Sequence, residues 1–276
     1  MTDLGYRFAA TLARRLPRTA SDTLADLCGD LYVATHPGRA GAVRRNLARA
    51  GMDAPDPRLT YRAFARAVRD FLASAPADAP RVSLDAEGRR HLAAARSVGG
   101  PAVLISGHFG PWERALHWIA GELGGIDAIA APHRDPLVER FFVARRAVGG
   151  VRTLRCERPA LAALERLRAG GWIAALVDRT ADGADPAGLV RIDRGPLLLA
   201  RRARALVLPG VSYIAADGTL QVRFDAPFVL DPRRGGLALP LALARLQRFF
   251  DGHVRAHPTQ WFEWRSAGER GAGVAA

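Results

Sequence analysis

The stretch that decides the fold reads Pro101-Ala-Val-Leu-Ile-Ser-Gly-His-Phe-Gly-Pro-Trp-Glu-Arg114. It begins with a short apolar run that predicts a buried strand, and a Gly-Pro turn and a helical pattern follow. A strand that ends in such a turn carries the next side chain to the rim of a sheet, where substrates bind. Imidazole accepts a proton near neutral pH, and a nearby carboxylate fixes its tautomer. We therefore expect His108 to act as a general base, with Glu113 as the carboxylate that orients it.

On both sides of this stretch, from residue 81 onward, strand-like runs alternate with helical patterns. Such alternation predicts an α/β fold, with a mostly parallel central sheet flanked by helices. A short turn at Asp217-Gly218 joins the last two strand-like runs and predicts an antiparallel hairpin. The expected strands are 102–106, 126–130, 151–154, 173–177, 206–214 and 220–224, and the expected helices are 112–123, 136–148, 159–169, 196–204 and 237–256.

The first 80 residues predict an N-terminal helical layer, with breaks at His36-Pro37-Gly38 and at 52–57. A Pro-rich segment at 75–80 separates this layer from an α/β core that we expect over 81–265. A flexible tail is expected at 266–276. Layer and core are expected to form one compact domain, because the chain is short enough for a single core.

The N-terminal residues form a basic amphipathic pattern. Leu4, Phe8, Leu12 and Leu16 recur at helical spacing with arginines between them. Such a helix either packs on its own domain or lies on an anionic membrane surface. No apolar run is long enough to span a bilayer, and no signal peptide is evident.

The chain has 276 residues and a net charge of +13, and all 40 of its basic residues are arginines. The lack of lysine excludes a Walker-A lysine and a Schiff-base lysine. A basic surface favours acidic partners, namely anionic lipid headgroups, an acidic carrier protein or nucleic acid. Nucleic acid is the weakest of these, since no basic tail is present. Cys28 and Cys156 predict neither a disulfide framework nor a metal site, and we expect both to be small apolar fillers.

The segment Gly107–Glu113 resembles the His-x4-Glu motif of the lipid A biosynthesis acyltransferase family, which includes the phosphatidylinositol mannoside acyltransferases. Pro111 replaces an asparagine that is usual there. The resemblance extends in the expected order from about residue 40 to 265. Its further segments are Arg44–Ala48, Glu87–Leu92, His133–Arg140, Leu176–Asp178 and His257–Phe262.

This resemblance implies a glycerolipid acyltransferase-like fold and a fatty acyl transfer. The donor would be an acyl carrier protein or coenzyme A thioester, and the acceptor a hydroxyl of a lipid-linked sugar, either lipid A-type or a glycophospholipid. No other cofactor and no metal are expected. The family pattern gives His108 the role of base and Glu113 that of its partner. It places Arg134 and Arg146 at substrate phosphates, and Asp178 where it holds an arginine or positions the acceptor. The expected location is the cytoplasmic face of the inner or plasma membrane, as a peripheral protein.

Two alternatives remain at this stage. The segment Val190–Gly195 lacks an aromatic pair that is common in the family's acceptor and acyl-chain pocket, which would fit a catalytically weak relative that binds acyl chains. Alternatively, an RNA-binding surface would be formed by the arginines together with the tryptophans Trp112, Trp118, Trp172, Trp261 and Trp264.

A site for a metal ion at His108, Glu113 and His117 lacks further ligands. The acceptor, acyl length, natural donor and oligomeric state are not set by the sequence.

Overall fold

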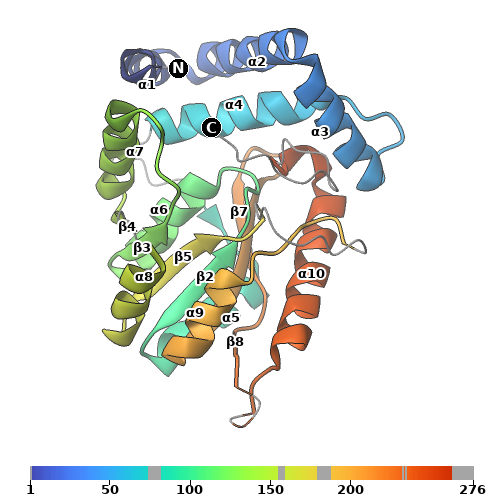
Figure 1. Ribbon diagram of the computed structural model, residues 1–276. Helices are drawn as coiled ribbons and strands as arrows, with labels where there is room; N and C mark the ends of the chain where they lie inside the picture. Colours follow the sequence, from blue (N-terminus) through green and yellow to red (C-terminus); the bar gives the residue numbers. More distant parts are fainter. Residues whose placement is uncertain are drawn as a thin grey trace.

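The computed structural model describes residues 2–73, 82–154, 159–178, 188–231, 233 and 235–262. These residues form an eight-stranded sheet with helices on both faces and a layer of helices across one end (Figure 1). The sheet order is β1-β7-β6-β2-β5-β3-β4, and β8 also pairs with β6. The strands are β1 (Val82–Ser83), β2 (Ala102–Ser106), β3 (Ile126–Ile129), β4 (Val151–Leu154), β5 (Trp172–Leu176), β6 (Leu206–Ile214), β7 (Leu220–Phe224) and β8 (Phe228–Val229).

The centre of the sheet is parallel, as the alternation of strands and helices predicts. β2 pairs in parallel with both β5 and β6, and β3 pairs in parallel with β4 and β5. β6 and β7 form the expected antiparallel hairpin around Asp217-Gly218. β1 and β8, each two residues long, were not expected from the sequence, because so short a run carries no periodicity.

Both faces of the sheet are covered, which explains why the first four residues of β2 are all apolar. Ala102 and Leu104 face a cluster with helices α5 (Ala86–Val98) and α6 (Trp112–Leu123). Val103 and Ile105 face the opposite cluster. That second cluster is built with α8 (Pro159–Arg168), α9 (Gly195–Ala203) and α10 (Leu239–Ala256). Each large aliphatic side chain buried in this way contributes about 1.5–3 kcal/mol of hydrophobic stabilisation.

The N-terminal layer consists of α1 (Asp3–Arg15), α2 (Arg18–Thr35), α3 (Pro37–Arg49) and α4 (Pro57–Ala73). α4 packs on both α2 and α6 and so joins the layer to the core (Figure 1). α7 (Pro136–Val148) lies between β4 and α1. The breaks before Pro37 and Pro57 agree with the sequence. The break at Pro17 was not expected, although a proline cannot donate the hydrogen bond that would continue α1.

Several sequence expectations concern residues that the structure leaves undescribed, among them the linker at 75–80, the tail at 266–276, Cys156 and Trp264. Cys28 is exposed, so the expectation that it fills an apolar interior is wrong. Within the described ranges, no helix combines the length and the apolar character needed to cross a membrane.

Candidate active site

His108 and Asp178 come together because the strands that precede them are parallel neighbours. Ser106, the last residue of β2, is in register with Leu176, the last residue of β5. Each functional side chain follows two residues later, and carboxyl ends of parallel strands lie at the same edge of the sheet. Nδ1 of His108 lies 2.7 Å from Oδ1 of Asp178, and the His108 backbone N–H donates to Oδ2 at 2.8 Å.

The Asp178 carboxylate is fully buried, with a side-chain exposure of 0%. It accepts a third hydrogen bond from Nε1 of Trp261 at 3.3 Å. A buried carboxylate that accepts the Nδ1 proton fixes the imidazole tautomer and leaves the Nε2 lone pair available. No group of the described residues bonds to Nε2 of His108, and the side chain is 15% exposed. This arrangement suits an imidazole that accepts a proton at Nε2 from a bound molecule.

Two glycines make the turn around His108 possible. A Cβ at Gly107 would lie 2.6 Å from the Phe109 ring and 3.0 Å from Cγ of Asp178. Gly110 has a φ of +52°, and a Cβ there would lie 2.6 Å from the carbonyl oxygen of Ser212. Only glycine meets both conditions without strain. The Ser212 hydroxyl donates to the Phe109 carbonyl at 2.8 Å and fixes the turn to β6.

The segment His257–Phe262 holds the same turn from the other side. Gly110 N donates to the Gln260 carbonyl at 2.7 Å, and Phe262 N donates to the His108 carbonyl at 2.9 Å. The Gln260 side chain is itself bonded to both backbone groups of Ile214 at 2.8 Å. Two segments that the sequence singled out separately therefore form one unit around His108.

Glu113 is not the partner of His108, so the pairing predicted from the sequence is wrong. Its carboxylate binds Arg146 of α7, with Nε–Oε distances of 3.0 and 3.1 Å and an Nη2–Oε1 distance of 2.6 Å. Both residues are buried, at 9% exposure each. Burial alone would lower the pKa of Arg146, but Glu113 and Glu139 raise it above the usual value for arginine. The sequence predicts that Arg146 contacts a substrate phosphate and that Asp178 holds an arginine or positions the acceptor. In the structure Arg146 binds Glu113 and Asp178 binds His108.

A second histidine and carboxylate lie next to this ion pair. Glu139 accepts the backbone N–H of His133 at 2.9 Å and lies 2.8 Å from its Nδ1. These bonds hold the pKa of Glu139 below its usual range, although burial opposes them. The side chain of Arg134, which follows His133, is exposed and makes no hydrogen bond or ion pair with another described residue. The structure therefore places Arg134 at the surface, where none of the described residues binds it.

Aromatic side chains from α4, α6 and the segment after α10 form a wall beside His108. The His108 ring meets Trp112 edge-on, with a centroid distance of 5.1 Å. Trp112 contacts Phe64 of α4 and Phe262, at 6.2 and 5.8 Å between ring centroids. This wall ties α4 to the residues that surround the imidazole.

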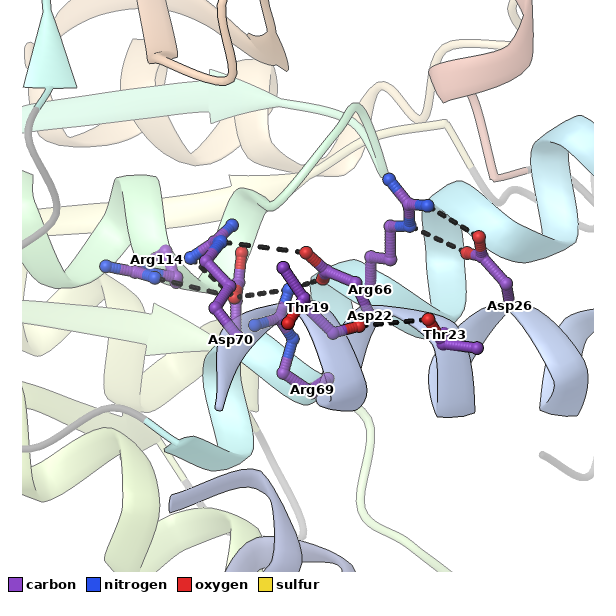
Figure 2. A network of polar contacts seen from close by, with 9 residues as sticks. Thr19, Asp22, Thr23, Asp26, Arg66, Arg69, Asp70 and Arg114 are labelled. Atoms are coloured by element: carbon purple, nitrogen blue, oxygen red, sulfur yellow. Dashed lines mark hydrogen bonds and ion pairs between the residues drawn. The ribbon is translucent and has the colours of Figure 1, made fainter. Parts of the chain in front are cut away.

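Ion pairs fix α4 to α6 on the same side. Arg114, the residue after Glu113, lies 3.7 Å from Asp70 of α4. Asp70 is 8% exposed at its side chain and also lies near Arg69 and Arg18. Figure 2 shows this group between the helical layer and the core. The start of α6, which follows the His108 turn, is thus attached to the layer by charge as well as by packing.

The altered segment Val190–Gly195 packs firmly beside the site. The backbone N–H groups of Leu189 and Val190 donate to the buried carboxylate of Asp251 on α10. Asp193 N donates to the Val177 carbonyl at 2.7 Å, directly before Asp178. The segment therefore supports the end of β5 although it lacks the aromatic pair that is common in the family.

His117 does not join His108 and Glu113 in a cluster of possible metal ligands. Its ring lies against Phe71, with a centroid distance of 5.6 Å, and below Gly149. Burial lowers the pKa of His117 to about 4, so it is neutral at pH 7. In the described part of the chain, no three histidine, cysteine, aspartate or glutamate side chains could hold a metal ion.

Comparison with known proteins shows that the chain is an acyltransferase. Residues 4–264 match the family described as bacterial lipid A biosynthesis acyltransferase, and the chain belongs to that family. It is similar to a phosphatidylinositol mannoside acyltransferase of Mycolicibacterium smegmatis, with 29% identity over 95% of this chain and 89% of the relative. A Mycobacterium tuberculosis protein of the same name is 28% identical, over 94% of this chain and 86% of its own.

Proposed function

We propose that this acyltransferase moves a fatty acyl group from a thioester to a hydroxyl of a lipid-linked sugar, with His108 as general base. The observation that carries this proposal is the His108–Asp178 pair at adjacent strand ends, with Nε2 left for a substrate. The donor would be acyl carrier protein or coenzyme A, and no other cofactor takes part. The names of the two relatives favour a glycophospholipid of the phosphatidylinositol mannoside class as acceptor.

The reaction follows from the chemistry of the groups. A sugar hydroxyl has too high a pKa to attack as an alkoxide, so Nε2 of His108 takes its proton as the oxygen attacks the thioester carbonyl. Asp178 stabilises the imidazolium that forms. The tetrahedral intermediate then expels the thiolate, which takes the proton from Nε2. The products are an ester and a free thiol, and no acyl-enzyme is required.

Glu113 would act through the position of α6 and not by touching the imidazole. Its ion pair with Arg146 joins α6, which begins directly after the His108 turn, to α7. Removing either partner would leave a buried charge without compensation, which is strongly destabilising. Arg134, exposed just before α7, remains the proposed contact for a substrate phosphate.

The proposed location is the cytoplasmic face of the membrane, as a peripheral protein. Lipid acceptors are embedded in a bilayer, and a net charge of +13 favours an anionic surface. Removing residues 1–20 should therefore weaken binding to anionic vesicles.

The alternatives are less well supported. The intact geometry of His108 and Asp178 argues against a relative that has lost catalysis. Trp261 is buried and bonded to Asp178, so it does not offer a face for stacking nucleic acid bases.

Thiol release tests the proposal. The purified chain, given acyl-coenzyme A or acyl carrier protein thioesters and a panel of glycolipid acceptors, should release thiol in an acceptor-dependent way. His108→Ala should lower this rate about 10²–10⁴-fold. An unchanged rate would remove His108 from the mechanism. RNA binding with steep salt dependence and no thioester cleavage would overturn the proposal as a whole.

A further inference from the structure

The outward face of α2 carries no charge between Arg18 and the end of the helix. Its exposed residues after Arg18 are Thr19, Ala20, Thr23, Leu24, Leu27, Cys28, Leu31, Ala34 and Thr35. Leu24, Leu27 and Leu31 are 40%, 60% and 65% exposed, and they recur at helical spacing. A helix on the surface of a soluble domain ordinarily turns its apolar stripe inward. α2 instead turns these three leucines outward.

The carboxylates of α2 are all turned toward the protein. Asp22, Asp26 and Asp30 pair with Arg69, Arg66 and Arg62 of α4 respectively, and Figure 2 shows the first two of these pairs. The Arg66 and Arg62 pairs are bidentate, with distances of 2.5–2.7 Å. Gly29 lets the two helices approach, since a Cβ there would lie 2.8 Å from the Arg62 backbone nitrogen. The ladder of ion pairs thus holds α2 with its leucines facing outward.

The neighbouring helix α1 also exposes apolar side chains, and arginines are exposed where α1 ends and α2 begins. Leu4 and Phe8 of α1 are 76% and 64% exposed. Arg14 and Arg15, at the end of α1, and Arg18, at the start of α2, are exposed as well. Leucine and phenylalanine side chains beside arginines are typical of helices that lie in the plane of an anionic bilayer.

We propose that the outer face of α2, together with Leu4 and Phe8 of α1, inserts into the acyl-chain boundary of an anionic bilayer. This inference rests on the proposed function, and it names the surface through which the enzyme meets its lipid. The face comprises Leu24, Leu27, Cys28 and Leu31 on α2. Since α4 packs on α2 and its Phe64 contacts Trp112, insertion would hold the His108 site at a fixed place near the headgroups.

Charge favours a bilayer over a second copy of the chain as the occupant. Two copies joined through this face would bring the same arginines together, each on a molecule of net charge +13. Anionic headgroups would instead neutralise them. The reach of Leu24, Leu27 and Leu31 also suits shallow insertion, because helices of this kind enter only about 5–10 Å.

Vesicle flotation with a matched control tests this surface. The variant Leu24→Ser/Leu27→Ser/Leu31→Ser should bind phosphatidylglycerol-containing vesicles at least about tenfold more weakly than the unmodified chain. The control Leu161→Ser/Leu198→Ser/Leu241→Ser removes three leucines of similar exposure from α8, α9 and α10 and should bind normally. Equal binding by the two triple variants would overturn the proposal.

Cys28 offers a second readout on a chain with its leucines intact. In a Cys156→Ser background, an environment-sensitive fluorophore on Cys28 should shift to the blue with anionic vesicles and be quenched by lipids brominated on their acyl chains. A water-like spectrum on bound protein would contradict insertion. The proposal would also be contradicted if the unmodified chain sedimented as a dimer in the absence of vesicles and the α2 triple variant sedimented as a monomer. Thiol release from soluble acyl-coenzyme A distinguishes failure of the membrane proposal from failure of the proposed reaction. If the chain binds vesicles through α2 but transfers no acyl group, only the proposed reaction is overturned.

Discussion

Asp178 binds both the imidazole ring and the backbone N–H of His108. Oδ1 lies 2.7 Å from Nδ1 of the imidazole, and Oδ2 accepts the backbone N–H of the same residue at 2.8 Å. The two residues are 70 positions apart in the sequence, and the parallel register of β2 and β5 brings them together. Since the carboxylate is buried and also bonded to Trp261, the ring is held in one orientation before any substrate binds.

The turn before α6 depends on a glycine. Gly110→Ala should cost about 1–3 kcal/mol in the free energy of unfolding, because its φ is positive and the new Cβ would meet the Ser212 carbonyl. Thiol release should fall as well, since the turn sets the place of His108. Urea unfolding monitored by circular dichroism measures the first effect.

Gly121→Ala is the matched control on α6. No atom lies within 4 Å of a Cβ there, so this change should stabilise the chain by about 0.5–1 kcal/mol. If the two substitutions changed the free energy of unfolding alike, the positive φ and the close approach to Ser212 would not constrain the turn at Gly110.

The Glu113–Arg146 pair gives a test of a positioning role against a catalytic one. Glu113→Gln should destabilise the chain by about 3–5 kcal/mol, because it removes the charge of the carboxylate that binds the buried Arg146. Glu113→Leu/Arg146→Met should recover most of that stability, and activity should return with it. Glu122→Gln on the same helix removes a carboxylate that is 40% exposed and should change stability by less than about 0.5 kcal/mol.

A Glu113→Gln chain as stable as the unmodified one, yet inactive, would contradict this account of Glu113. So would a double variant that regains stability without any acyl transfer. Either result would indicate that Glu113 contacts the reacting groups directly.

Two buried histidines predict how stability changes with pH. Burial lowers the pKa of His253 to about 3 and that of His117 to about 4. In the unfolded chain both titrate near 6.5, so below that pH the unfolded state binds more protons than the folded one. Stability should therefore fall as pH decreases from about 7 toward 4, by up to about 1.4 kcal/mol per pH unit for each histidine.

Chemical unfolding at several pH values measures this slope. His117→Gln/His253→Gln should flatten it, although the double variant is expected to be less stable at pH 7. A slope that the double variant leaves unchanged would place the responsible groups elsewhere.

Most of the core could be predicted from the sequence because its signals are local. The runs at 102–106 and 206–214 are mostly apolar, as strands buried on both faces are, and the sequence predicts both with their observed ends. Pro37 and Pro57 mark helix starts in the same direct way. β1 and β8 exist only through their pairing with β7 and β6, which no two-residue pattern reveals.

The site was less accessible to sequence reasoning, because its contacts are set by strand order. His108 and Asp178 were both recognised at strand ends, but their pairing requires β5 to lie beside β2, and these strands are not consecutive. Proximity in the sequence suggested Glu113 as the partner instead. The helical start at Trp112 turns Glu113 toward α7, where Arg146 binds it. The outward leucines of α2 likewise become visible only once Asp22, Asp26 and Asp30 are seen to face α4.

A double-mutant cycle on His108 and Asp178 tests the central claim most directly. Thiol release would be measured for His108→Ala, Asp178→Asn and the double variant, each checked for folding by circular dichroism. Asp178→Asn should lower turnover by about 10²–10⁴-fold, because the amide no longer holds the productive tautomer. If the aspartate acts through the imidazole, the double variant loses no more activity than His108→Ala alone. Losses that multiply would show that the two residues act independently and would contradict the account.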